Sequence, residues 1–159
     1  MERNYYYFLD KEGHIWHEGT EVDDVRFAFL VNRTLQPAAD GMYLVRCQNE
    51  NCFFRVEDVP YVVQDLAFHK NEKGELHQID LIFPGGYVEI LDPATLRVGA
   101  NNVLYCNVRK GSFDARFSRK AYFQLIPYLQ EDSESHRYYI ELNGLRRLIR
   151  QSVLAAGGS

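Results

Sequence analysis

The chain has 159 residues, of which 46% are hydrophobic, 14% aromatic and 25% charged, and its formal net charge is −4. This composition excludes a disordered, collagen-like or low-complexity protein, and the net acidity disfavours bulk nucleic-acid binding. No apolar run approaches the ~20 residues that cross a bilayer, the N-terminus is unlike a signal peptide, and three cysteines are an odd number for a disulfide framework, so we expect a cytoplasmic protein with no membrane partner.

The N-terminal residues predict a hairpin followed by a helix. Residues 5–9 are bulky and β-prone, residues 10–13 form a turn around Gly13, and residues 14–18 return as a second short strand. Asp23 or Asp24 can then cap a helix that ends before Pro37.

The remaining chain predicts mainly strands. Hairpins are expected from residues 42–47 with 52–56 and from 103–108 with 113–117, and single strands from residues 61–68, 76–83 and 137–142. Ser118 can cap a helix that Pro127 should kink or end, and residues 145–154 suggest a short amphipathic helix.

The second half of the chain falls on the first without a gap when the sequence is shifted by 61 residues. Residues 43–45 then align with 104–106, Arg55 with Arg116, and Tyr61 with Tyr122. Two β-rich halves can align by chance, but the unbroken register favours a duplication. We therefore predict an α+β protein of two tandem related units, each a small antiparallel sheet with a helix: residues 1–75, residues 76–145, and a C-terminal helix or tail over 146–159.

The clearest electrostatic feature is a basic segment. Residues 97–120 hold six Lys or Arg and only Asp114 as an acid. Arginine can grip phosphate or carboxylate with two parallel bonds, and free N–H groups at a helix start attract anions. The candidate ligand-binding residues are therefore Arg109, Arg116, Arg119, Lys120 and Tyr122. The alternative is a solvated charged face that pairs with the acidic first half.

The residues that could bind metal or catalyse are scattered. His14 and His17 lie on opposite faces of their expected strand. Cys47 and Cys52 could face each other across a hairpin, but no second ligand pair joins them or Cys106. No catalytic or nucleotide-binding motif is present, so no metal, cofactor or catalytic residue is assigned.

Several segments together resemble a bacterial family known as domain of unknown function 1285. Residues 13–19 resemble its "DGxWxHEG" opening, residues 56–63 its "VEDxPFxV" segment, and residues 102–108 and 115–122 its "LYCRVR" and "ARFTRxAYY" stretches. Lys120 stands where a proline is expected, and Pro127 interrupts a helix that members leave unbroken. The resemblance spans about residues 7–142. It implies a cytosolic two-unit α+β protein with a suggested role in signalling or regulation, and it brings no catalytic residues.

We therefore expect a non-enzymatic binding or regulatory module, monomeric or homodimeric, that recognises a protein or a small anionic ligand. One alternative is an enzyme with an unrecognised, dispersed active site. Another is an RNA-contacting protein that uses the basic segment 97–120 together with exposed aromatic side chains.

Overall fold

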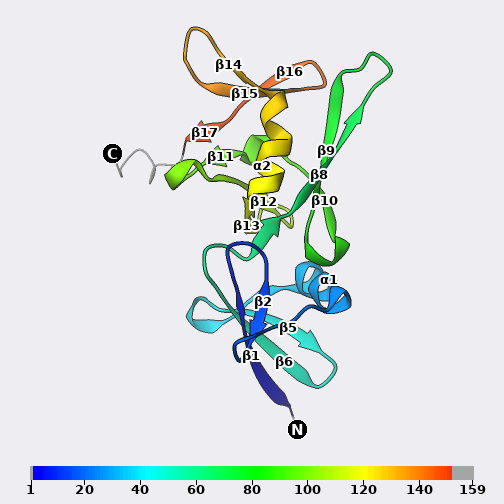
Figure 1. Cartoon of the computed structure of the whole chain (residues 1–159), viewed down its shortest axis with the longest axis vertical. Coiled ribbons are helices and arrows are strands. Elements are labelled where there is room, and N and C mark those ends of the chain that lie inside the picture. Colours follow the sequence, from blue (N-terminus) through cyan, green and yellow to red (C-terminus); the bar gives the residue numbers. More distant parts are fainter. Residues whose placement is uncertain (1, 152–159) are drawn as a thin grey trace. The chain divides into compact units, whose positions relative to one another are not determined.

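The computed structural model describes residues 2–151, and the chain forms two compact units (Figure 1). The first unit comprises Met1–Val62 with Phe83–Tyr87, and the second comprises Val63–Ile82 with Val88–Ser159. This division differs from the boundary expected after residue 75, because five residues return to the first unit after the chain has left it. Both helices and strands are present, which confirms the α+β class.

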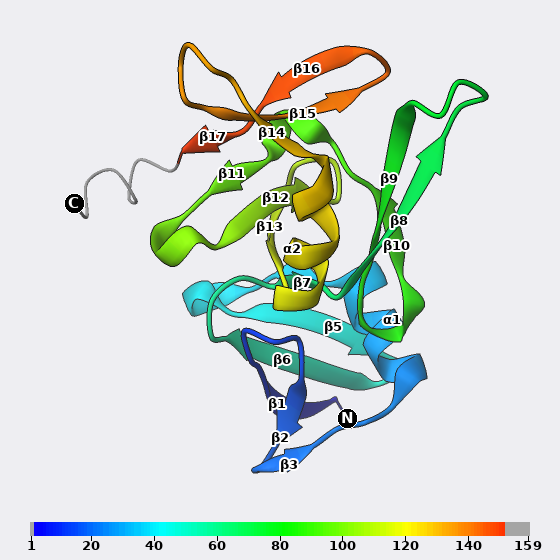
Figure 2. The same ribbon diagram turned by 45° about the horizontal axis from the view of Figure 1, so that its top comes forward.

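The first unit is built on one six-stranded sheet with the order β3-β2-β1-β6-β5-β4. Its elements are β1 (Arg3–Leu9), β2 (Ile15–His17), β3 (Thr20–Glu21), α1 (Val25–Thr34), β4 (Gln36–Pro37), β5 (Tyr43–Cys47) and β6 (Glu50–Val56). Figure 2 shows β5, β6, β1 and β2 in succession. The two predicted hairpins are confirmed, but β1 and β6 run parallel, so the sheet is mixed rather than antiparallel. A parallel neighbour is possible because α1 lies in the connection between them.

Helix α1 covers one face of this sheet. It begins at Asp24, whose side chain accepts hydrogen bonds from the backbone N–H groups of Arg26 and Phe27, as the capping prediction requires. The Phe27 ring packs on Tyr7 and Phe54, with ring centroids 5.3 and 6.2 Å away. Burial of these aromatic rings between helix and sheet makes the core of the first unit.

A buried polar contact ties residues 83–87 into the first unit. The Asn32 amide nitrogen donates to the carbonyl oxygens of Ala28 at 3.0 Å and Pro84 at 2.9 Å, and the Tyr61 hydroxyl donates to the Asn32 carbonyl at 2.6 Å. Figure 1 shows the turn at the tip of the β9–β10 hairpin against α1. Gly85 has φ +80°, and a Cβ there would overlap the backbone of Phe29. Only glycine therefore fits this contact.

The second unit contains two three-stranded sheets and a further sheet in which the order β17-β11-β12-β13 occurs. Strand β7 (Tyr61–Val63) leads into the unit. Its remaining elements are β8 (Asp65–Lys70), β9 (Leu76–Ile82), β10 (Val88–Ile90), β11 (Arg97–Val98), β12 (Leu104–Val108), β13 (Phe113–Phe117), α2 (Arg119–Leu125), β14 (Leu129–Glu131), β15 (Tyr138–Leu142), β16 (Leu145–Leu148) and β17 (Arg150–Gln151). As predicted, Ser118 caps α2, and the helix gives way to a short 3-10 turn containing Pro127.

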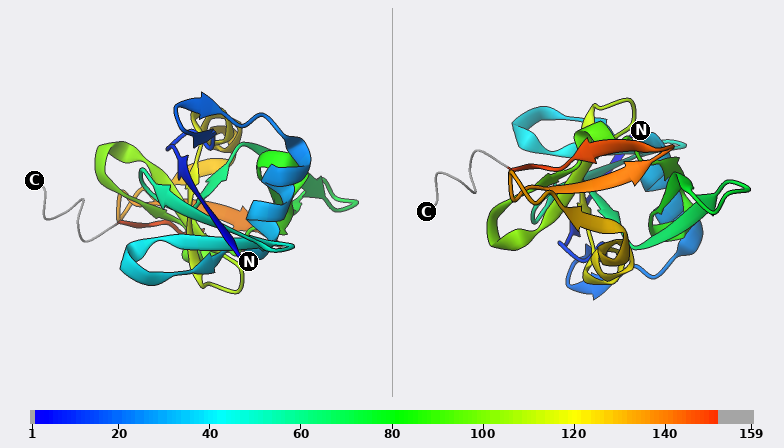
Figure 3. Two further views of the ribbon diagram at one scale, coloured as in Figure 1. Left: turned by 90° about the horizontal axis from the view of Figure 1, so that it is seen from below. Right: turned by 90° about the horizontal axis from the view of Figure 1, so that it is seen from above.

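The described part of the C-terminal segment is extended, not helical. Strands β15 and β16 form a hairpin, seen in orange and red in Figure 3, whose loop is Asn143–Gly144 with φ of +53° and +74°. Asn-Gly favours this two-residue hairpin turn, so the dipeptide overrides the helical spacing of the apolar residues that follow. The expected helix over 145–154 is therefore wrong for residues 145–151, and the rest of the expected C-terminal tail lies outside the described residues.

Several strand pairings recur 61 residues later. Gln36 and Pro37 pair with Leu44 and Tyr43, while Arg97 and Val98 pair with Tyr105 and Leu104. The pairing of Phe68 with Ile79 in β8–β9 likewise corresponds to that of Leu129 with Ile140 in β14–β15. The turns before β5 and β12 each contain one left-handed residue, Asp40 and Asn101. These correspondences occur at the spacing that the sequence alignment predicts.

Replacing Gly85 with alanine should destabilise the first unit. We expect Gly85→Ala to lower the free energy of unfolding by about 2–3 kcal/mol more than Gly86→Ala, because only Gly85 meets backbone atoms of α1. Gly86 has a similar φ of +84° with open space around it, so it reports the cost of a left-handed alanine alone, about 1 kcal/mol. Urea unfolding measures both; equal losses would contradict the close packing of the turn on α1.

Candidate functional site

The five predicted ligand-binding residues all lie in the second unit, but they do not form one cluster. Arg116 stands on β13 opposite Tyr105, while Arg109 follows β12 at the far end of the same hairpin. Arg119 and Lys120 begin α2, and Tyr122 lies further along that helix. The pairs Val108–Phe113 and Tyr105–Arg116 mark opposite ends of the hairpin, so Arg109 is held away from the helix start.

The basic side chains whose contacts are resolved interact within the unit. The Lys120 ammonium lies 3.0 Å from a carboxylate oxygen of Asp65, and Gln124 donates to the other oxygen at 2.6 Å. These hydrogen bonds, first from Gln124 and then from Lys120, lower the pKa of Asp65. The Arg119 guanidinium lies over the Phe123 ring at 5.5 Å, and that of Arg109 over Phe113 at 5.2 Å. For Lys120, the alternative of pairing with an acid from the first half of the sequence is therefore observed.

A larger concavity lies beside these residues, in the second unit alone. It has a volume of about 410 Å³, within the range of small-molecule pockets. Its walls come from β11, the turn before β12, α2 and the turn after it, β14, β15 and the segment around β17. The lining residues are Val98, Asn102, Leu104, Tyr122, Ile126, Leu129, Tyr138, Ile149 and Gln151.

The chemistry of this pocket is apolar with a few hydrogen-bonding groups. Aliphatic side chains form most of the wall, two tyrosines add rings with hydroxyl groups, and Asn102 and Gln151 add amides. None of these nine side chains carries a formal charge. A second pocket, near Lys70 and Glu141, measures about 220 Å³ and is smaller than usual ligand sites. The larger pocket is therefore the better candidate site.

Sequence reasoning found only Tyr122 among the pocket residues. The other eight come from segments that are separated along the chain and converge only through the fold. One local signal was available, because the Asn143–Gly144 dipeptide predicts the β15–β16 hairpin. That hairpin leads the chain back to β11, where Val98 pairs with Gln151 in parallel register.

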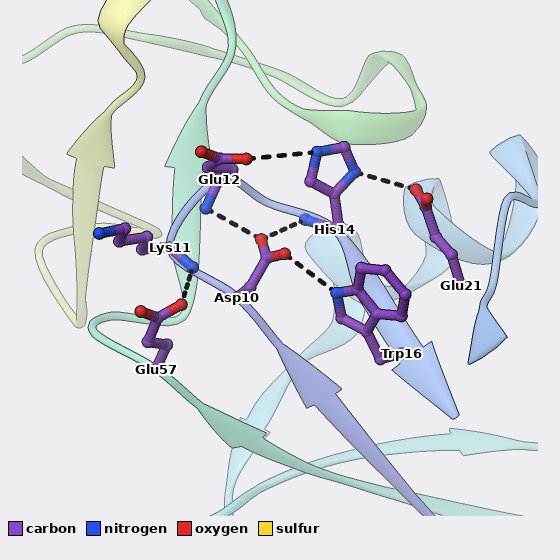
Figure 4. A network of polar contacts seen from close by, with 7 residues as sticks. All are labelled: Asp10, Lys11, Glu12, His14, Trp16, Glu21 and Glu57. Carbon is purple, nitrogen blue, oxygen red and sulfur yellow. Dashed lines mark hydrogen bonds and ion pairs between the residues drawn. The ribbon is translucent and has the colours of Figure 1, made fainter. Parts of the chain in front are cut away.

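A network of polar contacts closes the first hairpin (Figure 4). The carboxylate of Asp10 accepts hydrogen bonds from the backbone N–H groups of Glu12 and His14, each at 2.9 Å, and from the indole of Trp16 at 3.0 Å. The His14 ring lies 2.9 Å from Glu21, and Lys11 N–H donates to Glu57 at 2.9 Å. Burial raises the pKa of Asp10, but the bonds from Trp16, His14 and Glu12 outweigh it, so the pKa lies below its ordinary value.

This network has a structural explanation. Asp10 organises the turn through its backbone bonds, and Trp16 contributes a ring to the sheet face while its N–H is satisfied. His14 faces Glu21, whereas His17 contacts the backbone carbonyl of Tyr6, in agreement with the predicted separation of the two histidines. Within residues 2–151, no group of three or more His, Cys, Asp or Glu side chains could hold a metal ion.

The three cysteines are free thiols. Cys47 pairs across its hairpin with Glu50, and Cys52 with Val45, so the suggestion that the two cysteines face each other is wrong by register. The two-residue turn Gln48–Asn49 sets this offset, because it brings Cys47 opposite Glu50. Cys106 is fully buried in β12, and burial raises its pKa to about 12, which keeps the thiol protonated and unreactive.

Over the part of the chain that the structure describes, no helix is long and apolar enough to cross a membrane. The helices are too short for the roughly 20 residues that a bilayer requires.

Asp10 should make the stability of the chain depend on pH. Because its pKa is lower folded than unfolded, its contribution is complete above the unfolded pKa and is lost as the pH falls through the folded pKa. We expect Asp10→Asn to cost about 1–3 kcal/mol near pH 7, and the gap from the wild type to narrow towards about pH 3. Urea unfolding across this range tests it, with the exposed Asp23→Asn as control; a gap that stays constant with pH would contradict the role of the carboxylate.

Comparison with known proteins finds likeness in structure only. No family model matches the chain, and no curated protein matches it. A DUF1285 family protein from Silicibacter pomeroyi DSS-3 superposes with a TM-score of 0.68 and 14% sequence identity, over 94% of this chain and 84% of that one. A DUF1285 family protein from Shewanella baltica OS155 gives a TM-score of 0.56 and 18% identity, over 76% of this chain and 90% of the other. The resemblance noted in the sequence is thus confirmed as a likeness of fold to DUF1285 family proteins.

Proposed function

We propose that the chain is a non-enzymatic, cytoplasmic regulatory module that binds a small molecule in the pocket of its second unit. The observation that carries this proposal is the pocket itself, about 410 Å³ in volume with a mainly apolar wall and a few polar groups. Ligand-binding pockets commonly have this size and composition. The three free cysteines support a reducing compartment.

The lining selects the class of ligand. An uncharged wall offers no counter-ion to a buried phosphate or carboxylate, and an unpaired charge in such surroundings is costly. Aliphatic contacts and the faces of Tyr122 and Tyr138 favour an apolar or aromatic body. The hydroxyls of these tyrosines and the amides of Asn102 and Gln151 can hydrogen-bond one polar group on that body. We therefore favour a neutral, largely apolar small molecule over the anionic ligand first considered.

Binding without catalysis is the reading that the titratable groups support. Active sites usually gather groups with perturbed pKa values. The described groups whose pKa clearly departs from its ordinary value are Tyr7, Asp10, Cys52, Asp65, Asp80, Cys106 and Asp132, and none of them lines the pocket. The basic segment remains the candidate for an anion or RNA, although the contacts of Lys120, Arg119 and Arg109 give those side chains partners within the unit.

We also propose that the chain arose by internal duplication. The shared 61-residue spacing of the β4–β5 and β11–β12 pairings, and of the β8–β9 and β14–β15 pairings, supports it. The first copy has Tyr61 on a strand where the second has Tyr122 on a helix. That divergence places Tyr122 on a pocket wall and accounts for a binding site in the second copy.

A thermal-shift screen tests the pocket. We expect neutral, apolar or aromatic compounds to raise the melting temperature, and phosphorylated metabolites not to. A ligand at 100 times its dissociation constant adds about 2.7 kcal/mol, or roughly 5–10 °C for a chain of this size. Tyr138→Ala should abolish the shift, since it removes one wall of the pocket at a side chain that is already 51% exposed.

Two variants serve as controls. Phe123→Ala removes a similarly exposed ring, 54%, from α2 outside the pocket, and it should leave the shift unchanged. Arg119→Ala separates the two sites: a shift that is seen only with anionic compounds and is lost in Arg119→Ala would move the ligand to the basic segment and overturn the pocket proposal.

A further inference from the structure

The face of the first-unit sheet opposite α1 exposes aromatic side chains. Tyr6 and Phe8 on β1 are 60% and 41% exposed, although both belong to a strand in the middle of the sheet. Tyr5 and Tyr7 alternate with them and point to the other face, where Tyr7 packs against Phe27 of α1. Exposed aromatic side chains at the centre of a sheet are unusual for a surface that faces only water.

The strand registers define this surface, which we call the open face. Tyr6 lies beside Phe53 of β6, and their rings stack with centroids 5.5 Å apart. Phe8 lies between Arg55 on β6 and Trp16 on β2. Since paired residues point to the same side of a sheet, these side chains form a continuous aromatic strip across β2, β1 and β6.

Charge changes sign from one side of the open face to the other. On the β3 side, Glu21 pairs with Trp16 and lies within 2.9 Å of His14. Residues 10–24, which contain β2 and β3, hold six carboxylates and one lysine. On the opposite side, Arg55 of β6 and Arg46 of β5 share the open face and are exposed, and neither forms an ion pair within the described residues. The face is therefore acidic, then aromatic, then basic.

We propose that the open face is an interface with a second copy of this chain. A two-fold axis perpendicular to the sheet reverses the order of the strands, so it sets the basic side of one copy against the acidic side of the other and the aromatic strip against itself. Symmetric dimers need such a self-complementary patch. Aromatic residues and arginine, which make up its centre, are also the side chains enriched in protein interfaces.

The charge of the unit decides against nucleic acid as the occupant. Stacked aromatics beside arginines would also suit a single strand. However, residues 1–62 and 83–87 hold 6 basic and 11 acidic side chains, a net of −5, and Glu21 lies on the face itself. A polyphosphate chain would be repelled there, whereas a copy of this chain brings arginines to the same carboxylates.

Sedimentation of the full chain over a range of concentrations tests this interface, which is independent of the pocket in the second unit. We expect a dimer whose dissociation constant rises at least about tenfold in Tyr6→Ser and in Phe8→Ser, since each substitution acts twice in a symmetric dimer. Phe123→Ser changes a similarly exposed ring in the second unit and should leave dissociation unchanged. Circular dichroism confirms that each variant is folded.

Charge reversal gives the sharper result. Arg46→Glu alone and Glu21→Arg alone should each weaken the dimer, and the double variant should recover affinity, because the exchanged charges again face each other across the two-fold axis. A wild-type chain that stays monomeric at high concentration would overturn the proposal. So would a dimer that survives both serine substitutions, or a chain that copurifies with nucleic acid and releases it in Tyr6→Ser.

Discussion

The buried amide of Asn32 is the contact on which closure of the first unit depends. Its nitrogen holds the Pro84 carbonyl, and its own backbone carbonyl accepts from Tyr61. Removing the side chain would leave buried polar atoms without partners, which costs far more than the bond itself contributes. The five returning residues must then approach α1 so closely that only Gly85 fits. The first unit is thereby built from two separate stretches of chain, and its integrity depends on a contact that spans 52 residues.

Local chemistry could be predicted from the sequence, and long-range pairing could not. Asp24 and Ser118 cap helices because their side chains satisfy free N–H groups nearby, and Pro127 follows the end of α2. These effects act within a few residues. The parallel pairing of β1 with β6 joins segments 47 residues apart, such as Arg3 and Glu50, and nothing near either strand encodes it. Residues 145–151 show a different failure: the apolar spacing favoured a helix, while the preceding Asn143–Gly144 turn committed the chain to a hairpin.

The candidate site illustrates the same limit. A charged segment is visible in any sequence, so the basic residues 97–120 attracted the first hypothesis. In the folded chain Lys120 meets Asp65 and Arg119 meets Phe123, which are contacts that a solvated charged face makes. An apolar pocket leaves no comparable mark in the sequence, because its wall is drawn from the same side chains that fill cores. Tyr122 was included only because it neighbours the arginines along the chain, yet it is the one predicted residue that lines the pocket.

The pocket and the open face lie in different units and share no residues, so a regulatory role requires that one influence the other. The chain crosses between the units within β7 and at each end of residues 83–87. Two of these crossings flank the turn that Asn32 and Gly85 hold against α1. A ligand in the second unit can shift self-association only if it binds the monomer and the dimer with different affinity. The strands β9 and β10, which enter and leave that turn, are the covalent route for such a difference, and comparison of ligand affinity in the wild type and in Phe8→Ser measures it directly: equal affinities would make binding and assembly separate functions of one chain.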